Sequence, residues 1–295
     1  MARRFPRLEA WRADGRVRNV RGHDLYYRDS SSVHPEVMLL LHGFPTSSFD
    51  WRAMWDGLAA RFRVIAPDLL GFGFSAKPPE ERYTIVRQAD LVESLLVRLH
   101  ISRVHLLAHD YGDTVAQELI ARERDGKARV QIASACLLNG GLFPEAHRPR
   151  LVQRLLATRA GPTIVRWAGE RGFKRSLAGV FGPDTPRSPL QLDEYWALTY
   201  ERGGQLLLPA LSGYMAERRE RRGRWVGALQ SKGPSLRFIV GLADPVSGRA
   251  MAQRFRELVR DGDVVGLEAI GHYPHCEAPD AVLESVLQFH ARHSR

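Results

Sequence analysis

An aspartate lies where an apolar segment turns abruptly into a helical one. The stretch VHLLAHDYGDTVAQEL begins as a buried strand, and Asp110 occupies the turn before the helical half. Ala108 and Gly112 lie two positions to either side. A tight strand-to-helix turn needs small residues at these places because backbone meets backbone there. The pattern is typical of a nucleophile elbow, and it predicts an Asp110 carboxylate held at the sheet edge, facing a pocket.

A carboxylate at this position favours one kind of chemistry. It displaces a leaving group at carbon and forms an alkyl-ester intermediate, which water must then hydrolyse. That second step needs a general base and a carboxylate that orients the base. Asp244 follows the apolar run at 236–240, and His272 follows the run at 264–270. We therefore predict a triad of Asp110, Asp244 and His272, in the chain order of α/β-hydrolases.

Each of these residues also has a simpler interpretation. Asp110 could only cap the helix that follows it, His272 could be a loop histidine bonded to backbone, and Asp244 before Pro245 could be a turn residue. The coincidence of residue types, order and strand ends favours the triad.

A second motif supports it. Leu41-His42-Gly43-Phe44-Pro45 follows an apolar strand, and in this architecture the loop after that strand supplies one backbone N–H to an oxyanion hole. The residue after the nucleophile supplies the other. Phe44 and Tyr111 are the predicted main-chain donors.

Composition limits the classes of protein. The 295 residues have 44% hydrophobic content, enough for one α/β core with an inserted subdomain, and two cysteines do not make a disulfide framework. The net charge of +10 comes almost entirely from arginine, since only four of 43 basic residues are lysine. We interpret the one dense cluster, at 218–224, as a solvated helix face and expect no nucleic-acid partner.

Targeting and cofactor signals are missing from the sequence. The first 18 residues are charged throughout, and no stretch reaches the roughly 18 apolar residues of a membrane span. The sequence also has no metal-ligand spacing, and Gly71-Phe72-Gly73 does not form a dinucleotide fingerprint. We expect a cytoplasmic protein with no membrane partner, no metal and no cofactor; its oligomeric state stays open.

Short apolar runs alternate with helical segments along the chain. The pattern predicts a leading hairpin at 16–28, then a mostly parallel sheet covered by helices on both faces. The predicted strands are 36–42, 62–66, 103–108, 130–138, 235–241 and 264–270, and the predicted helices are 48–60, 84–99, 112–124, 247–260 and 278–292.

The segment from 142 to 225 has helical periodicity broken by Gly-Pro pairs and no convincing strand. We predict an all-helical lid there, with core segments at 1–141 and 226–295. Its aromatic residues are expected mostly in the lid's own core, with a few walling an apolar pocket: Phe143, Trp167, Phe173, Phe181, Tyr195, Trp196, Tyr200 and Tyr214.

Several motifs together resemble one family. They are HGFPTSSFDW, RVIAPDLLGFGFSAKP, AHDYGDTVAQEL, LNGGLFPEAHRP, RGRWVGAL and GHYPHCEAP. The chain is similar to the α/β-hydrolase superfamily, in its epoxide hydrolase and haloalkane dehalogenase branch, and most of all to the mesoderm-specific transcript protein group. The resemblance runs from about residue 37 to the C-terminus and implies the α/β-hydrolase fold and an aspartate nucleophile.

The resemblance also suggests roles for further residues. Epoxide hydrolases protonate the opening ring from lid tyrosines, and Tyr214 lies where similar enzymes place one of them; Tyr195 and Tyr200 are candidates for the second. Asn139 stands at a strand end where some relatives place the triad acid. His42, Tyr195, Tyr200 and Asn139 are the candidate substrate-binding residues.

The leaving group remains the open choice. Haloalkane dehalogenases hold the halide with a tryptophan after the nucleophile and often an asparagine after His-Gly, whereas this chain has Tyr111 and Phe44. Fluoroacetate-type enzymes carry arginines just after the nucleophile, where Tyr111 and Thr114 stand. We predict an epoxide hydrolase that converts a small apolar epoxide and water to a vicinal diol. The alternatives are a haloalkane dehalogenase and a hydrolase-fold binding protein without turnover.

Overall fold

One sheet organises the molecule. The computed structural model describes residues 5–185 and 188–293, and within them eight strands form a sheet of order β1-β2-β4-β3-β5-β6-β7-β8. Its strands are β1 Arg16–Val20, β2 His23–Asp29, β3 Val37–Leu41, β4 Arg63–Pro67, β5 Arg103–His109, β6 Gln131–Leu138, β7 Ser235–Gly241 and β8 Asp263–Leu267. Strand β2 pairs antiparallel with β1 and β4, and the other pairings are parallel. The predicted α/β-hydrolase fold is confirmed.

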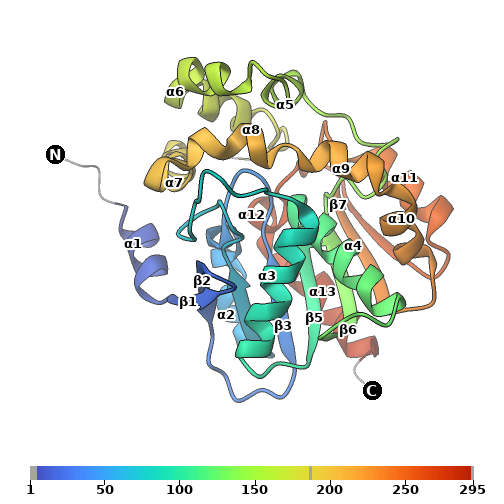
Figure 1. Ribbon diagram of the computed structural model, residues 1–295. Helices are drawn as coiled ribbons and strands as arrows, with labels where there is room; N and C mark the ends of the chain where they lie inside the picture. Colours follow the sequence, from blue (N-terminus) through green and yellow to red (C-terminus); the bar gives the residue numbers. More distant parts are fainter. Residues whose placement is uncertain (1–4, 186–187, 294–295) are drawn as a thin grey trace.

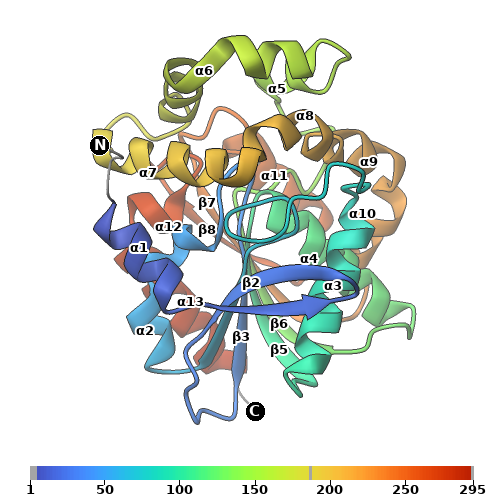
Figure 2. The ribbon, with the colours of Figure 1, turned by 60° about the vertical axis from the view of Figure 1, so that its left-hand side comes forward.

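Helices cover both faces of this sheet (Figures 1 and 2). One face carries α3 Ile85–Arg98, α4 Tyr111–Arg124 and α11 Arg249–Leu258, and the other carries α1 Pro6–Ala13, α2 Trp55–Ala59 and α13 Pro279–His293. The strands alternate between the two apolar layers: Leu106 joins the first and Leu107 the second. Because both faces are covered, the central strands are mostly apolar.

Three of the differences between these elements and the sequence prediction concern α1, the segment at 48–60 and β8. Helix α1 is absent from the prediction. It is fixed by tertiary contacts, since the Trp11 indole N–H donates to Ser48 Oγ at 3.2 Å and Arg28 lies 4.1 Å from the Trp11 ring. The helix predicted at 48–60 divides into a 3₁₀ turn, η1 Ser48–Ala53, and α2, and β8 ends at Leu267 instead of residue 270.

Between β6 and β7 the described residues form helices only. These are α5 Leu151–Leu156, α6 Gly161–Ala178, α7 Pro189–Tyr200, η2 Glu201–Leu207, α8 Leu208–Leu211, α9 Tyr214–Glu220 and α10 Arg222–Gln230. Figure 1 shows α5 to α8 stacked over one end of the sheet. The predicted lid boundary at residue 225 falls inside α10, which packs against α4 of the core: the Trp225 indole N–H donates to Glu118 Oε2 at 2.8 Å.

The first turn of α4 crosses β3 at very short range. A Cβ placed on Gly112 would lie 2.3 Å from the carbonyl oxygen of Leu41 and 2.8 Å from that of His42. Neither oxygen can move without shifting the strand and the loop after it. Glycine is therefore required at this position by the elbow itself.

We expect Gly112→Ala to lower the free energy of unfolding by about 2 kcal/mol or more, because the backbone must shift to admit the methyl group. Urea denaturation measures this. Gly223→Ala in α10, where nothing lies within 4 Å of the added Cβ, is the matched control and should be neutral or slightly stabilising. Equal stability of the two variants would contradict the close crossing.

Candidate active site

Asp110 occupies a strained turn between β5 and α4. Its backbone has φ 46° and ψ −99°, a conformation that side-chain-bearing residues rarely adopt. The turn is held by the Asp110 N–H, which donates to the Leu138 carbonyl at 3.1 Å. The Asp110 side chain makes no capping hydrogen bond to α4. Its carboxylate is therefore available for contacts on the other side, away from the helix it precedes.

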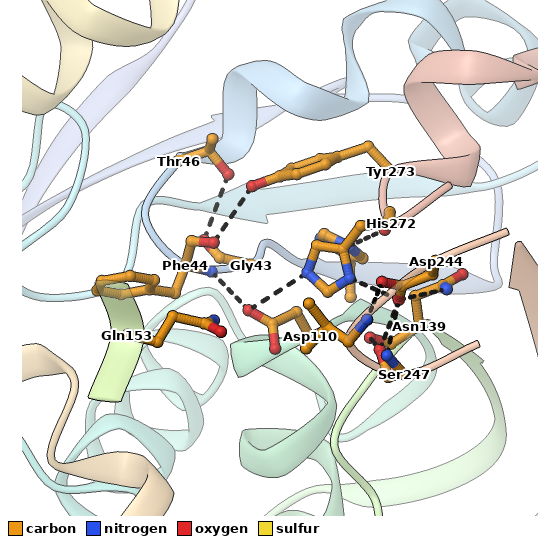
Figure 3. Close-up of polar contacts among 12 residues, drawn as sticks. Gly43, Phe44, Thr46, Asp110, Asn139, Gln153, Asp244, Ser247, His272 and Tyr273 are labelled. Atoms are coloured by element: carbon orange, nitrogen blue, oxygen red, sulfur yellow. Dashed lines mark hydrogen bonds and ion pairs between the residues drawn. The ribbon is translucent and has the colours of Figure 1, made fainter. Parts of the chain in front are cut away.

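Three groups surround that carboxylate, and all are buried; Figure 3 shows two of them, Phe44 and His272. The Phe44 N–H donates to Oδ2 at 3.2 Å, and Nε2 of His272 lies 3.9 Å from the same oxygen. On the other side, Nη2 of Arg218 lies 3.4 Å from Oδ1 and donates to the Asp110 carbonyl at 2.8 Å. Tyr111, the first residue of α4, leaves its N–H without a partner inside the helix.

Asp244 orients His272. The Nδ1–H of His272 donates to Asp244 Oδ2 at 2.8 Å. Asp244 in turn accepts hydrogen bonds from the Val246 N–H at 2.7 Å, the Ser247 N–H at 3.1 Å and the Ser247 hydroxyl at 2.7 Å. The donors fix the carboxylate in its loop, and the carboxylate fixes the imidazole so that Nε2 faces Asp110.

Asn139 lies at the end of β6 and belongs to the same network. Its Nδ2 donates to Asp244 Oδ2 at 2.8 Å and to the Gly241 carbonyl at 3.1 Å, while its Oδ1 accepts from the Gly241 N–H at 2.8 Å. It does not line the cavity described below. The structure thus places Asn139 behind the acid as its support, and the substrate contact expected from the sequence stays a prediction.

Arg218 is the site residue that the sequence interpretation missed. The 218–224 cluster was expected on a solvated helix face, but Arg218 is only 2% exposed and its Nε donates to Thr114 Oγ1 at 2.7 Å. Its guanidinium lies 4.4 Å from the Tyr214 ring centroid. Spacing could have revealed it: residues four apart on a helix share one face, so an inward Tyr214 implies an inward Arg218.

The buried charges compensate one another. Burial alone would raise the pKa of Asp110, but the His272 imidazolium 3.9 Å away and the charge of Arg218 outweigh burial and lower it. Burial would lower the pKa of His272, but the Asp244 and Asp110 carboxylates raise it well above its ordinary value. At neutral pH the site therefore holds two carboxylates, an imidazolium and a guanidinium, with no net charge.

The neighbouring titratable groups are uncharged. Burial, and then the charge of His272, lowers the pKa of His109, whose Nε2–H donates to the His272 carbonyl at 2.7 Å. Burial raises the pKa of Asp113 well above its usual range. His42 is also buried, and both of its ring nitrogens bond to backbone: Nδ1 to the Gly43 carbonyl at 2.9 Å and Nε2 to the Leu69 N–H at 3.0 Å. These bonds keep His42 from acting as a substrate ligand.

The candidate tyrosines lie in different surroundings. Tyr214 is buried with its ring 4.9 Å from Tyr111 and 6.0 Å from Phe44, and its hydroxyl has no hydrogen-bond partner among the described residues. Tyr195 directs its hydroxyl toward Gln191, at 3.3 Å, and Cys276, at 3.4 Å. Tyr214 thus packs against Tyr111 and Phe44, the two residues whose N–H groups are the predicted oxyanion donors.

An apolar cavity of about 120 Å³ lies between the lid and this site. Its floor includes Phe44, His272 and Tyr273. Of the lid aromatics, Phe173, Trp196 and Tyr200 line it, whereas Trp167 is 85% exposed. Gln153, which the sequence interpretation also missed, lines the cavity and lies beside Asp110 in Figure 3.

Two groups of side chains among the described residues have the composition of a metal site. Asp50, His109 and His275 are buried, with one ligand atom each inside 4.8 Å of the others; Glu36, His105 and His290 form the second group. Burial raises the pKa of Asp50 to about 7, and Thr46 donates to its carboxyl group. A carboxyl that retains its proton near neutrality is a weak cation ligand.

Comparisons with known proteins agree with the fold. The model of the alpha/beta hydrolase family matches residues 38–285. The mesoderm-specific transcript protein of Mus musculus is 42% identical over 294 residues, covering 96% of this chain and 88% of its own length.

Solved structures give the same result. A haloalkane dehalogenase, DbeA from Bradyrhizobium elkani, superposes with a TM-score of 0.79 at 25% identity, covering 95% of this chain and 98% of the other. The epoxide hydrolase CorEH gives a TM-score of 0.76 at 20% identity, covering 94% and 98%, which is a likeness of fold alone. Within residues 5–185 and 188–293, no helix is long and apolar enough to cross a membrane.

The charge balance gives a prediction for Asp110→Asn. Removing this carboxylate takes away one of the two anions that raise the pKa of His272, so the pKa should fall toward neutrality by about one unit or more. NMR titration of the His272 ring measures it. Asp113→Asn is the matched control, because burial already keeps that carboxyl uncharged. A His272 pKa that is unchanged in Asp110→Asn would refute the coupling.

The same shifts fix the sign of the pH dependence. The pKa of His272 is raised in the folded state, so its contribution to stability is complete at pH values below its pKa in the unfolded chain, about 6.5. This contribution is lost as the pH rises through the pKa of His272 in the folded protein. The pKa of Asp110 is lowered in the folded state, so its contribution to stability is present at pH values above its pKa in the unfolded chain, about 3.9. This contribution is lost as the pH falls through the pKa of Asp110 in the folded protein. The pair therefore contributes most in the neutral range.

Proposed function

Since the chain belongs to the alpha/beta hydrolase family, we propose that it hydrolyses a carbon electrophile through an alkyl ester on Asp110, and that this electrophile is an epoxide. The observation that carries the proposal is the buried Asp110 carboxylate at the strained elbow, with an amide donor on one oxygen and the His272 imidazole 3.9 Å away. An aspartate built only for structure would cap its helix or pair with a surface cation.

In the first step, a carboxylate oxygen of Asp110 forms a bond to one epoxide carbon while the ring C–O bond breaks. The bonding pair goes to the ring oxygen, which takes a proton from the Tyr214 hydroxyl. Burial, and then the Asp110 charge, raises the pKa of Tyr214, so the phenol is protonated at neutral pH. An alkoxide is a stronger base than a phenolate, so the transfer is downhill, and the proton of His272 restores the phenol.

In the second step, His272 acts as the base. Alkylation removes the negative charge of Asp110, and with it part of what held the His272 proton. The neutral imidazole takes a proton from water, and the water oxygen bonds to the ester carbonyl carbon. The Phe44 and Tyr111 N–H groups hold the oxyanion. Collapse breaks the C–O bond between the acyl carbon and the substrate oxygen. The departing alkoxide takes the proton of the new Asp110 carboxyl group, which leaves a vicinal diol and the Asp110 carboxylate.

Leaving-group chemistry separates this proposal from a dehalogenase. A halide departs without a proton, so a dehalogenase has no need of a phenol beside its nucleophile, whereas an epoxide oxygen needs one. The residue after the nucleophile is Tyr111 and not a tryptophan, so no indole N–H stands there for a halide. Dehalogenation with the same Asp110, Asp244 and His272 is the second candidate, supported by the fold likeness to DbeA.

The cavity supports a small apolar substrate. Helices α5 and α6 contribute Gln153 and Ser176 to its lining, and otherwise aliphatic and aromatic side chains: Val152, Leu156, Ile164, Val165, Ala168, Phe173 and Leu177. A strongly polar substrate would exchange water for this surface with few hydrogen bonds in return. We therefore expect alkyl or aryl epoxides, with the reacting carbon directed toward Asp110.

We expect wild-type protein to convert a panel of terminal, styrene-type and internal epoxides to diols, and Asp110→Ala to lose at least about three orders of magnitude in kcat/KM. In His272→Gln the ester should accumulate, because its hydrolysis has lost its base. Intact-protein mass spectrometry would show the substrate mass added to His272→Gln and absent from the Asp110→Ala, His272→Gln double variant. Diol formation by Asp110→Ala at the wild-type rate would refute the nucleophile.

Tyr214→Phe separates the two leaving groups. We expect it to slow epoxide opening by about 10²-fold or more, because the ring oxygen loses its proton donor, and to leave any haloalkane turnover nearly unchanged. Tyr195→Phe is the matched control: its hydroxyl faces Cys276 and Gln191, so both activities should stay near wild type. Halide release without diol, insensitive to Tyr214→Phe, would assign the protein to the dehalogenases.

A further inference from the structure

Helices α5 and α6 expose apolar side chains on the face that points away from the cavity. Trp167 is 85% exposed, Leu151 68% and Leu155 40%. Leu151 and Leu155 are four residues apart on one helix face, so their exposed side chains lie next to each other. Figure 2 shows α5 and α6 as the outermost layer of the molecule, above α7 and α8. These three side chains are therefore not covered by another element.

Positive charge surrounds this apolar surface. Between residues 151 and 178 the sequence has six basic side chains and one acidic side chain, Glu170, although the helices span a tenth of the chain. Five of the six are exposed and form no ion pair with any residue in the described ranges: Arg154, Arg159, Arg166, Arg171 and Arg175. The sixth, Lys174, pairs with Glu170 and Asp193. Arg154 lies on α5, Arg159 between the two helices and Arg166 on the first half of α6, and Arg171 and Arg175 follow the kink of α6 at Gly169.

The inner faces of the same helices are already in use. Val152, Leu156, Ile164 and Val165 line the cavity or pack around it. A lid helix that only covers a cavity needs one apolar face, and its outer face should be polar. Here the outer face carries a tryptophan, two leucines and five unpaired arginines. The outer composition is thus not explained by packing against the core.

We propose that this outer face, Leu151, Leu155 and Trp167 with Arg154, Arg159, Arg166, Arg171 and Arg175, docks on an anionic lipid surface. Tryptophan and leucine enter the boundary between headgroups and acyl chains, and arginines bind lipid phosphates while their stems remain in apolar contact. Each basic residue near an anionic lipid surface contributes to the binding free energy, and the contributions of the five arginines add together. Exposed leucines give nothing to a nucleic acid, whose backbone is charged and whose grooves are polar.

The contact is peripheral. A docked α5–α6 layer would place the cavity one helix diameter, about 10 Å, from the lipid headgroups. From the lengths of its apolar runs, the sequence predicts no membrane partner, and no helix in the described residues could span a membrane. Neither observation concerns a protein that binds to the surface of a membrane without crossing it. Docking is also independent of the reaction proposed above, because none of the eight side chains lines the cavity.

Vesicle co-sedimentation of the full chain tests the proposal. We expect binding to vesicles of phosphatidylcholine with roughly one quarter phosphatidylglycerol, weak binding to phosphatidylcholine alone, and loss of binding as salt rises. Trp167→Ala and Arg166→Glu should each lower the partition coefficient by about tenfold. The matched control is Arg256→Glu, an exposed arginine on α11 that makes the same change in net charge and should bind as wild type.

Other outcomes would overturn the proposal. Equal losses in Arg166→Glu and Arg256→Glu would mean that net charge alone drives binding, with no docking face. Unchanged vesicle binding by Trp167→Ala would show that the exposed apolar side chains do not take part in docking. A shift in size-exclusion mass in Trp167→Ala, without vesicle binding by the wild type, would assign the face to a second copy of the chain. Thermal melting of each variant separates loss of binding from loss of fold.

Discussion

The whole site depends on the electrical balance of four buried charges around a strained turn. Asp110 and Asp244 are the anions, and His272 and Arg218 the cations; each is at least nine-tenths buried. A single unpaired charge in this interior would cost several kcal/mol, so no one of the four is independent of the others. The balance also explains why Asp110 can hold φ 46°: the groups that compensate its charge also hold its carboxylate and its carbonyl in place.

The parallel sheet brings these groups together. In the register of the central strands, Leu41 pairs with Ala108, His109 with Leu138, and Gly241 with Leu267. The carboxyl ends of β3, β5, β6, β7 and β8 therefore finish at one edge, and the loops just beyond them carry the oxyanion donor, the nucleophile, Asn139, Asp244 and His272. Ligands bind at this edge in α/β sheets for the same reason. The register of the parallel strands, and not the nearness of these residues in the sequence, therefore brings the site together.

This is also why much of the site could be predicted from the sequence. Asp110, Asp244 and His272 follow apolar runs that end abruptly, and Gly112 marks the elbow, so local patterns place all of them. Arg218 was not placed in this way, because no apolar run ends beside it and the neighbouring Glu217 and Glu220 favour a solvated face. Its one signal in the sequence is the four-residue spacing from Tyr214, and its contacts with Asp110 and Thr114 identify it. Helix α1 escaped prediction because Trp11 is held by partners distant in the sequence.

The position of Arg218 links the lid to the chemistry. It lies on α9 together with Tyr214, so one lid helix carries both the cation that balances Asp110 and the phenol beside it. Moving α9 away would leave the elbow carboxylate without one of its two compensating cations, at the cost of a buried charge. That cost ties α9 to the core. Helices α5 and α6 carry no charge that balances Asp110, because their cavity-lining side chains are apolar apart from the uncharged Gln153 and Ser176. A displacement of α5 and α6 would therefore break no ion pair of the nucleophile, whereas a displacement of α9 would break the one between Arg218 and Asp110.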